Sequence, residues 1–127
     1  MALLQPVLQG IPLRTVLESV LAQPQHELLR HPIKKWVAKP DDRVVGRAIS
    51  SACYVEDAFP AVAFLALKYH DDLESALISN TNLGGDNADR GAVLGALLGA
   101  ANGFDAIPVR WARSLKVPPP MVKPVVF

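Results

Sequence analysis

The chain has 127 residues, half of them hydrophobic and a fifth charged, which allows a packed core and excludes the composition of a disordered segment. Its 13 basic and 12 acidic residues leave a net charge of +1, so the composition gives no reason to expect binding to nucleic acid or to an anionic membrane. The most apolar stretches run for about ten residues, whereas a membrane-spanning helix needs about 20.

The first residues and the cysteine content bear on the cellular location of the protein. Residues 1–8 lack the basic start and the cleavage-type ending of a secretory signal. The single cysteine, Cys53, cannot form an internal disulfide or a cysteine metal cluster, and we expect it to be a small buried side chain. These features predict a cytoplasmic protein.

Residues 1–40 form a first region, a partial N-terminal helical segment that five prolines divide into short pieces. Hydrophobic residues recur at helical spacing over Leu13–Ala22, which predicts an amphipathic helix. We expect a second helix over Glu27–Ala38, with a break or kink near Pro32.

Residues 41–117 carry the dense helical pattern of the predicted core. Paired acids at Asp41-Asp42 and at Asp71-Asp72 mark two helix starts, and we interpret both pairs as solvated. Between them the sequence predicts a helix over Ala58–Tyr69 that is apolar on most faces, with Pro60 in its first turn.

A glycine-rich helix follows over about Asp89–Ala101 and is expected to end at Asn102-Gly103. A last short helix opens at Pro108, and residues 118–127 form a proline-rich tail. No alternating strand pattern of any length appears, so the predicted fold class is all-α, a multi-helical bundle.

Glycine recurs at every fourth position of the glycine-rich helix, at 91, 95, 99 and 103. Each interior glycine costs a helix about 1 kcal/mol relative to alanine. We therefore expect this helix to lie at the centre of the fold, with Gly95 and Gly99 pressed against a neighbouring element.

The segment that can carry chemistry lies between these helices and contains Gly84, Gly85, Asp86, Asn87 and Asp89. In one interpretation it is a turn whose short polar side chains cap the following helix. In the other, the helix start offers N–H groups to a phosphate, and the two carboxylates, three positions apart, face one side and bind Mg²⁺ or Ca²⁺.

The run Leu83–Asp86, followed by Gly91–Ala100, resembles the C-terminal signature of ADP-ribosylglycohydrolases, a Gly-Gly-Asp-Thr-Asp-Thr turn before a glycine- and alanine-rich helix. Three further segments agree with the family in order and spacing, and they are Val55–Tyr69, Asp72–Leu77 and Ile107–Trp111. The similarity extends over about residues 41–116 and more weakly over residues 13–40.

The resemblance implies an all-helical hydrolase that removes ADP-ribose from modified targets and holds two Mg²⁺ ions between N-terminal and C-terminal acidic motifs. Asp86 matches the first metal-binding aspartate of the C-terminal turn. Asp89 is a second metal-ligand candidate, and Gly84, Gly85 and Asn87 are ligand-binding candidates. No catalytic residue is assigned.

The chain also departs from the family pattern. Ala88 stands where the family has its second aspartate, Asn87 replaces a threonine, and Asp89 stands where the next threonine belongs. A Thr-Asp-Asp-Thr-type N-terminal motif is absent, so we expect Mg²⁺ binding by this chain alone to be weak or absent. His26, His31 and His70 are scattered, and we expect them at the surface.

Two hypotheses follow. In the first, the complete protein hydrolyses ADP-ribosyl bonds with Mg²⁺, acting on an ADP-ribose-type small molecule or an ADP-ribosylated target, and this chain is inactive alone. In the second, the chain is a non-catalytic helical module that binds an ADP-ribose-like ligand or a protein partner. Apolar surface left uncovered also predicts self-association.

Overall fold

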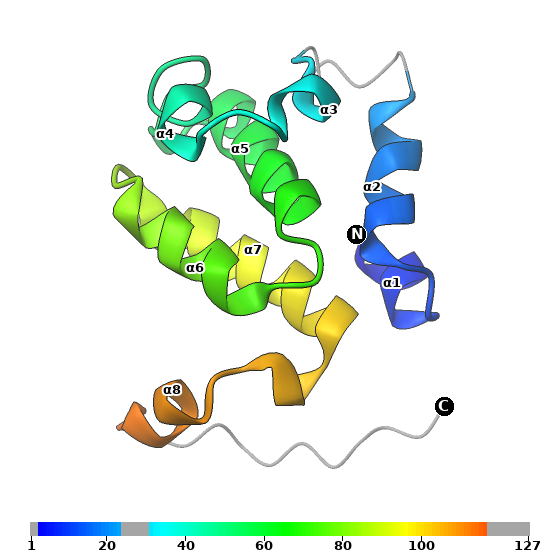
Figure 1. Ribbon diagram of the computed structural model, residues 1–127, viewed down its shortest axis with the longest axis vertical. Helices are drawn as coiled ribbons and strands as arrows, with labels where there is room; N and C mark the ends of the chain where they lie inside the picture. Colours follow the sequence, from blue (N-terminus) through cyan, green and yellow to red (C-terminus); the bar gives the residue numbers. More distant parts are fainter. Residues whose placement is uncertain (1–2, 24–30, 117–127) are drawn as a thin grey trace.

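The computed structural model describes residues 3–23 and 31–116 and is drawn in Figure 1. In these ranges the chain forms helices and no strand; the only β-type pairing is an isolated bridge between Val45 and Ile49. The all-α prediction is confirmed. The helices in chain order are α1 (Leu4–Leu8), α2 (Leu13–Leu21), α3 (Ile33–Trp36), α4 (Asp41–Val44), α5 (Val55–Lys68), α6 (Leu73–Asn82), α7 (Asn87–Asn102), the 3₁₀ turn η2 (Phe104–Ala106) and α8 (Val109–Ser114).

Helix α5 forms the centre of the core. All its residues from Pro60 to Leu67 are buried, because α2, α3, α6 and α7 pack around it. The predicted start was wrong: α5 begins at Val55, so Pro60 lies inside the helix rather than in its first turn. The extended backbone of Tyr54 ends the preceding loop, and Glu56 and Asp57 favour a helix start by opposing the positive end of the helix dipole.

Helices α6 and α7 pack side by side, as Figure 1 shows, and α7 also packs against α5. Leu94, Leu97 and Leu98 of α7 are buried. The predicted central position of this helix is therefore confirmed, but Ala92 and Ala96 are exposed, so the glycine–alanine face that motivated the prediction is not packed along its whole length.

The glycines of α7 serve different purposes. A Cβ atom at Gly91 would lie 2.8 Å from Nδ2 of Asn80, which leaves no room for a larger residue. At Gly95 it would make an ordinary contact with Leu77 at 3.8 Å, and at Gly99 it would meet nothing within 4 Å. The expectation that Gly99 presses on a neighbour was therefore wrong, and the close approach lies one turn from the start of the helix.

The N-terminal region covers one side of this core. Helix α2 confirms the predicted amphipathic segment, with Leu13, Val16 and Leu17 buried against α5 and α7. Residues 24–30, which include part of the second predicted helix and His26, lie outside the described residues, and α3 begins directly after Pro32. The proline-rich tail also lies outside the described residues.

Asp41 begins helix α4 as predicted, but the prediction that its side chain is solvated was wrong. Its carboxylate, 14% exposed, accepts hydrogen bonds from Nζ of Lys68 at 2.6 Å, from the hydroxyl of Tyr69 at 2.7 Å and from the hydroxyl of Ser79. This network joins the start of α4 to the end of α5 and to the second half of α6. Asp42 is exposed, as expected.

Two other predictions concern exposure. Cys53 is exposed, because it precedes α5 in a surface loop, and its expected burial was wrong. The Asp71-Asp72 prediction is confirmed, since both acids are exposed and Asp72 caps α6 by accepting a hydrogen bond from the amide of Ser75 at 2.9 Å. No helix within the described ranges has the length and hydropathy needed to cross a membrane.

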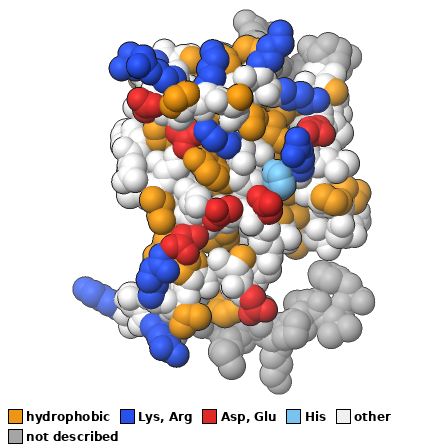
Figure 2. Space-filling view, viewed as in Figure 1, with side chains coloured by type: hydrophobic (Ala, Val, Ile, Leu, Met, Phe, Trp, Pro, Cys, Tyr) orange, Lys and Arg blue, Asp and Glu red, His pale blue; other side chains and the backbone are white. Residues whose placement is uncertain are grey.

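Charged side chains are not mixed evenly over the surface. On the face in Figure 2, lysine and arginine side chains gather over α3 and α4 and again at α8, and several acidic side chains lie between these groups. On this face, charged side chains of the same sign therefore lie in separate groups.

Candidate functional site

The turn between α6 and α7 requires glycine at two successive positions. Gly84 and Gly85 have φ angles of +66° and +63°, a left-handed conformation that other residues rarely adopt. A Cβ atom at Gly85 would lie 2.2 Å from the carbonyl oxygen of Ser51. The two glycines therefore let the chain reverse while its backbone lies directly against the loop before α5.

That loop fixes the next residue. The amide of Asp86 donates a hydrogen bond to the carbonyl of Ser51 at 2.9 Å. Asp86 takes the N-cap position of α7, but its side chain makes no capping hydrogen bond. The interpretation of Asp86 as an ordinary capping side chain is not what the geometry shows, and its half-buried carboxylate is available to a ligand.

Asp86 and Asp89 line the same pocket, about 210 Å³ in volume, between the starts of α5 and α7. This agrees with their spacing of three positions on one helical turn. The other lining residues are mostly apolar, with Cys53 and Arg90 beside the acids: Cys53, Val55, Ala58, Phe59, Val62, Arg90 and Val93.

Arg90 and Asn80 form the buried polar centre next to this pocket. They are 3% and 2% exposed, and Nε of Arg90 donates to Oδ1 of Asn80 at 2.6 Å. Burial lowers the pKa of the Arg90 guanidinium, and the negative charge of Asp86 acts in the opposite direction. The guanidinium therefore carries a positive charge within reach of the field of Asp86.

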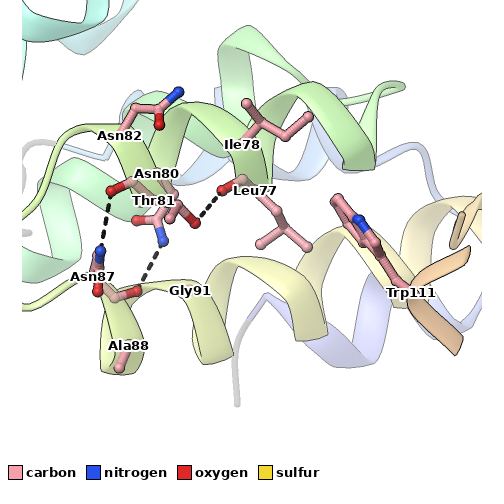
Figure 3. A pocket seen from close by; sticks show the side chains of 9 residues that line it. All are labelled: Leu77, Ile78, Asn80, Thr81, Asn82, Asn87, Ala88, Gly91 and Trp111. Atoms are coloured by element: carbon pink, nitrogen blue, oxygen red, sulfur yellow. Dashed lines mark hydrogen bonds between the residues drawn. The ribbon is translucent and has the colours of Figure 1, made fainter. Parts of the chain in front are cut away.

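Asn87 and Ala88 face a different groove, shown in Figure 3, of about 490 Å³ between α6, α7 and Trp111 of α8. The Asn87 side chain is turned toward α6, where Nδ2 donates to the carbonyl of Thr81 at 3.1 Å. The predicted site residues are thus divided: Asp86 and Asp89 share one pocket, and Asn87 lines another. Ala88, at the family's second aspartate position, does not line the pocket of Asp86.

The carboxylates of Asp86 and Asp89 are the groups here that could hold a metal ion. Mg²⁺ is often bound by one or two carboxylates together with phosphate oxygens of a ligand. No group of three or more histidine, cysteine or acidic side chains suited to a metal occurs among residues 3–23 and 31–116. Two carboxylates and the phosphate oxygens of a ligand are a donor set that Mg²⁺ accepts, but these two residues alone do not complete a two-ion site.

Sequence reasoning missed Ser51, Asn80 and Arg90. Ser51 acts through its backbone, which no side-chain pattern reveals. Arg90 did leave a signal, because it is the only long charged side chain in a helix of small and aliphatic residues. An arginine in such a context indicates a buried partner.

Comparison with known families identifies a match over most of the chain. A family model described as ADP-ribosylglycohydrolase matches residues 1–123 of the chain. No curated protein and no solved structure gives a significant match.

Proposed function

Because the chain belongs to the ADP-ribosylglycohydrolase family, we propose that the pocket of Asp86 and Asp89 forms one side of a site for ADP-ribose. The ligand is an ADP-ribose-type small molecule or the ADP-ribose group of a modified target. The observation that carries this proposal is that two carboxylates line one pocket at the start of a 16-residue helix. The Asp86 side chain makes no capping hydrogen bond there.

The chemistry of this pocket suits a diphosphate ligand in the presence of a cation. The N-terminal N–H groups and the dipole of α7 attract anions. Asp86 and Asp89 repel phosphate unless a cation lies between, and Mg²⁺ prefers such a mixture of carboxylate and phosphate oxygens. We propose Mg²⁺ as the cofactor, as two ions in the complete family site, with Asp86 as one ligand and Asp89 as a second. When bound, Mg²⁺ would neutralise phosphate charge and activate water.

We further propose that this chain alone does not hydrolyse ADP-ribosyl bonds. The described residues supply two carboxylates to the pocket and no third acid or histidine, so groups that orient water and substrate are lacking there. Positioning of reactants contributes several kcal/mol to barrier lowering, about 7–11 kcal/mol in favourable cases, and is lost with those groups.

The test is an ADP-ribose release assay on ADP-ribosylated protein with Mg²⁺, using the 127-residue chain and its Asp86→Ala variant. Both should release ADP-ribose no faster than the protein-free control. Turnover by the unaltered chain that disappears in Asp86→Ala would refute this proposal and establish the chain as a complete hydrolase.

The second candidate function is a non-catalytic module that binds an ADP-ribose-like ligand or a protein. Ala88 favours it, because the family's second aspartate is missing and Ala88 does not line the Asp86 pocket. Joining the chain to an upstream segment that carries a Thr-Asp-Asp-Thr-type motif distinguishes the two functions. Hydrolysis by the joined protein supports the enzyme, and binding without hydrolysis supports the module.

We also propose self-association through the apolar surface beside the pocket. Tyr54, Val55 and Val93 are 68%, 61% and 51% exposed, although all three are large hydrophobic residues. Sedimentation velocity over a range of concentrations should show an oligomer that Val93→Lys weakens. A concentration-independent monomer would contradict this proposal.

A further inference from the structure

The buried side chain of Arg90 bridges the Gly84–Asp86 turn. Nη2 of Arg90 donates to the carbonyl oxygens of Gly84 at 2.8 Å and Asn80 at 3.2 Å, and Nε donates to Oδ1 of Asn80. Arg90 follows the turn in the chain, whereas Asn80 and Gly84 precede Asp86. The guanidinium therefore ties together the two sides of the turn.

Asn80 fixes the orientation of this guanidinium. Its Oδ1 accepts from Arg90, and its Nδ2 donates to the carbonyl of Asn87 at 2.8 Å, so both ends of the amide are used. The absence of a side chain at Gly91 lets the amide come this close to α7. The pair is buried, so its hydrogen bonds do not compete with water, and charge-assisted bonds of this kind are among the strongest in proteins.

We propose that Arg90 is a positioning residue for Asp86: oriented by Asn80, its guanidinium acts as a built-in cation that keeps the turn in shape without a divalent ion. The role given to Asp86 rests on the proposed function. The planar fork of arginine reaches acceptors on both sides of the turn, which the single ammonium of lysine cannot do. Asp86 is then held between this clamp and the hydrogen bond that its backbone N–H donates to the carbonyl of Ser51.

Hydrogen exchange of the Asp86 amide, followed by NMR on the ¹⁵N-labelled full chain, tests the inference. In the unaltered chain the amide should exchange at the same slow rate with EDTA and with saturating MgCl₂. Arg90→Lys should speed its exchange by about tenfold or more, the effect of one lost hydrogen bond. Amides in the centre of α5 should not change.

Asn102→Ala is the matched control. Asn102 also donates two side-chain hydrogen bonds to backbone carbonyls, those of His70 and Leu98, but at the other end of α7. This variant should leave exchange at Asp86 unchanged. Wild-type exchange at Asp86 in Arg90→Lys, or protection of that amide only when Mg²⁺ is present, would overturn the inference.

If Arg90→Lys does not fold, two variants of Asn80 decide the question. Asn80→Asp keeps an oxygen that orients Arg90 but loses the Nδ2 bond to Asn87, whereas Asn80→Leu has a similar size and loses both bonds. The Asp86 amide should therefore be clearly better protected in Asn80→Asp than in Asn80→Leu. Equal exchange in the two variants contradicts the inference.

A calorimetric titration with ADP-ribose separates the inference from the proposed function. Weaker binding by Arg90→Lys supports the positioning role, and unchanged binding contradicts it. If the unaltered chain binds no ADP-ribose, the proposed function fails, and the exchange measurement still decides the role of Arg90.

Discussion

Among the glycines of the chain, Gly85 has the least freedom to change. Its positive φ and the 2.2 Å approach of a Cβ atom to the Ser51 carbonyl combine strain with a clash against backbone. We expect Gly85→Ala to lower the free energy of unfolding by about 2–4 kcal/mol. Gly99→Ala is the matched control in open space, and it should raise stability by about 0.5–1 kcal/mol through helix propensity. Urea melts measure both, and equal effects would contradict the described turn.

Asp72 and Asp86 test whether an acid at a helix start caps the helix. Asp72 accepts a hydrogen bond from the Ser75 amide, whereas Asp86 makes no capping bond from its side chain. Asp72→Ala should therefore cost about 1 kcal/mol of stability, and Asp86→Ala should cost clearly less. The opposite order in denaturant melts would mean that Asp86 has a structural role and would weaken its assignment to a ligand site.

The exposure and hydrogen-bond partners of single residues were the features least predictable from the sequence. The paired acids at Asp41-Asp42 look alike in the chain, yet only Asp41 is drawn into a network, because Lys68, Tyr69 and Ser79 come from helices far away in the sequence. Gly84 and Gly85 could be predicted, because a sharp turn needs their conformational freedom. Tertiary contacts thus decide what local patterns leave open.

At the scale of helices, the Asp41 network predicts a dependence of stability on pH. Burial alone would raise the pKa of Asp41, but hydrogen bonds from Lys68, Ser79 and Tyr69 outweigh burial and hold it below the ordinary value of 3.8. Burial and the Asp41 charge raise the pKa of Tyr69 from 10.0 to about 12. A depressed pKa of an acid stabilises the folded state above pH 3.8, and a raised pKa does so below pH 10.

The network should therefore stabilise the fold between these limits. Its contribution is lost as the pH falls below 3.8, and also as the pH rises from 10 toward 12. Asp41→Asn should lower stability near neutral pH by about 1–3 kcal/mol and flatten the acid limb of a plot of unfolding free energy against pH. Asp42→Asn, an exposed neighbour, is the control. An unchanged acid limb in Asp41→Asn would show that the network does not titrate as described.

Helix types and order were largely predictable, and helix boundaries less so. The α2 and α6 segments begin where their hydrophobic spacing and acidic cap indicate. Helix α7 begins at Asn87, two residues before the predicted start at Asp89. The backbone hydrogen bond from Asp86 to Ser51 ends the turn at Asp86, and the side-chain pattern gives no sign of this bond. Docking of one element on another set this boundary, and a linear sequence does not display it.

At the scale of the whole molecule, the family and the all-helical architecture were both predictable, because the Gly-Gly-Asp turn and the glycine-rich helix occur together in a fixed order. The separation of the predicted site residues into two pockets was not predictable from the sequence. Asp86 and Asp89 share a pocket, while Asn87 lines a groove on the α6 side. Helical geometry explains the split, because successive residues point in directions about 100° apart.

The central claim is that Asp86 holds a cation against the phosphates of ADP-ribose. Calorimetric titration of ADP-ribose with MgCl₂ and with EDTA tests it most directly, using the unaltered chain, Asp86→Asn and the exposed control Asp105→Asn. The unaltered chain and the control should bind ADP-ribose about tenfold or more tightly with Mg²⁺, and Asp86→Asn should lose this dependence. Equal affinity with Mg²⁺ and with EDTA in the unaltered chain, or a retained Mg²⁺ dependence in Asp86→Asn, would contradict the claim.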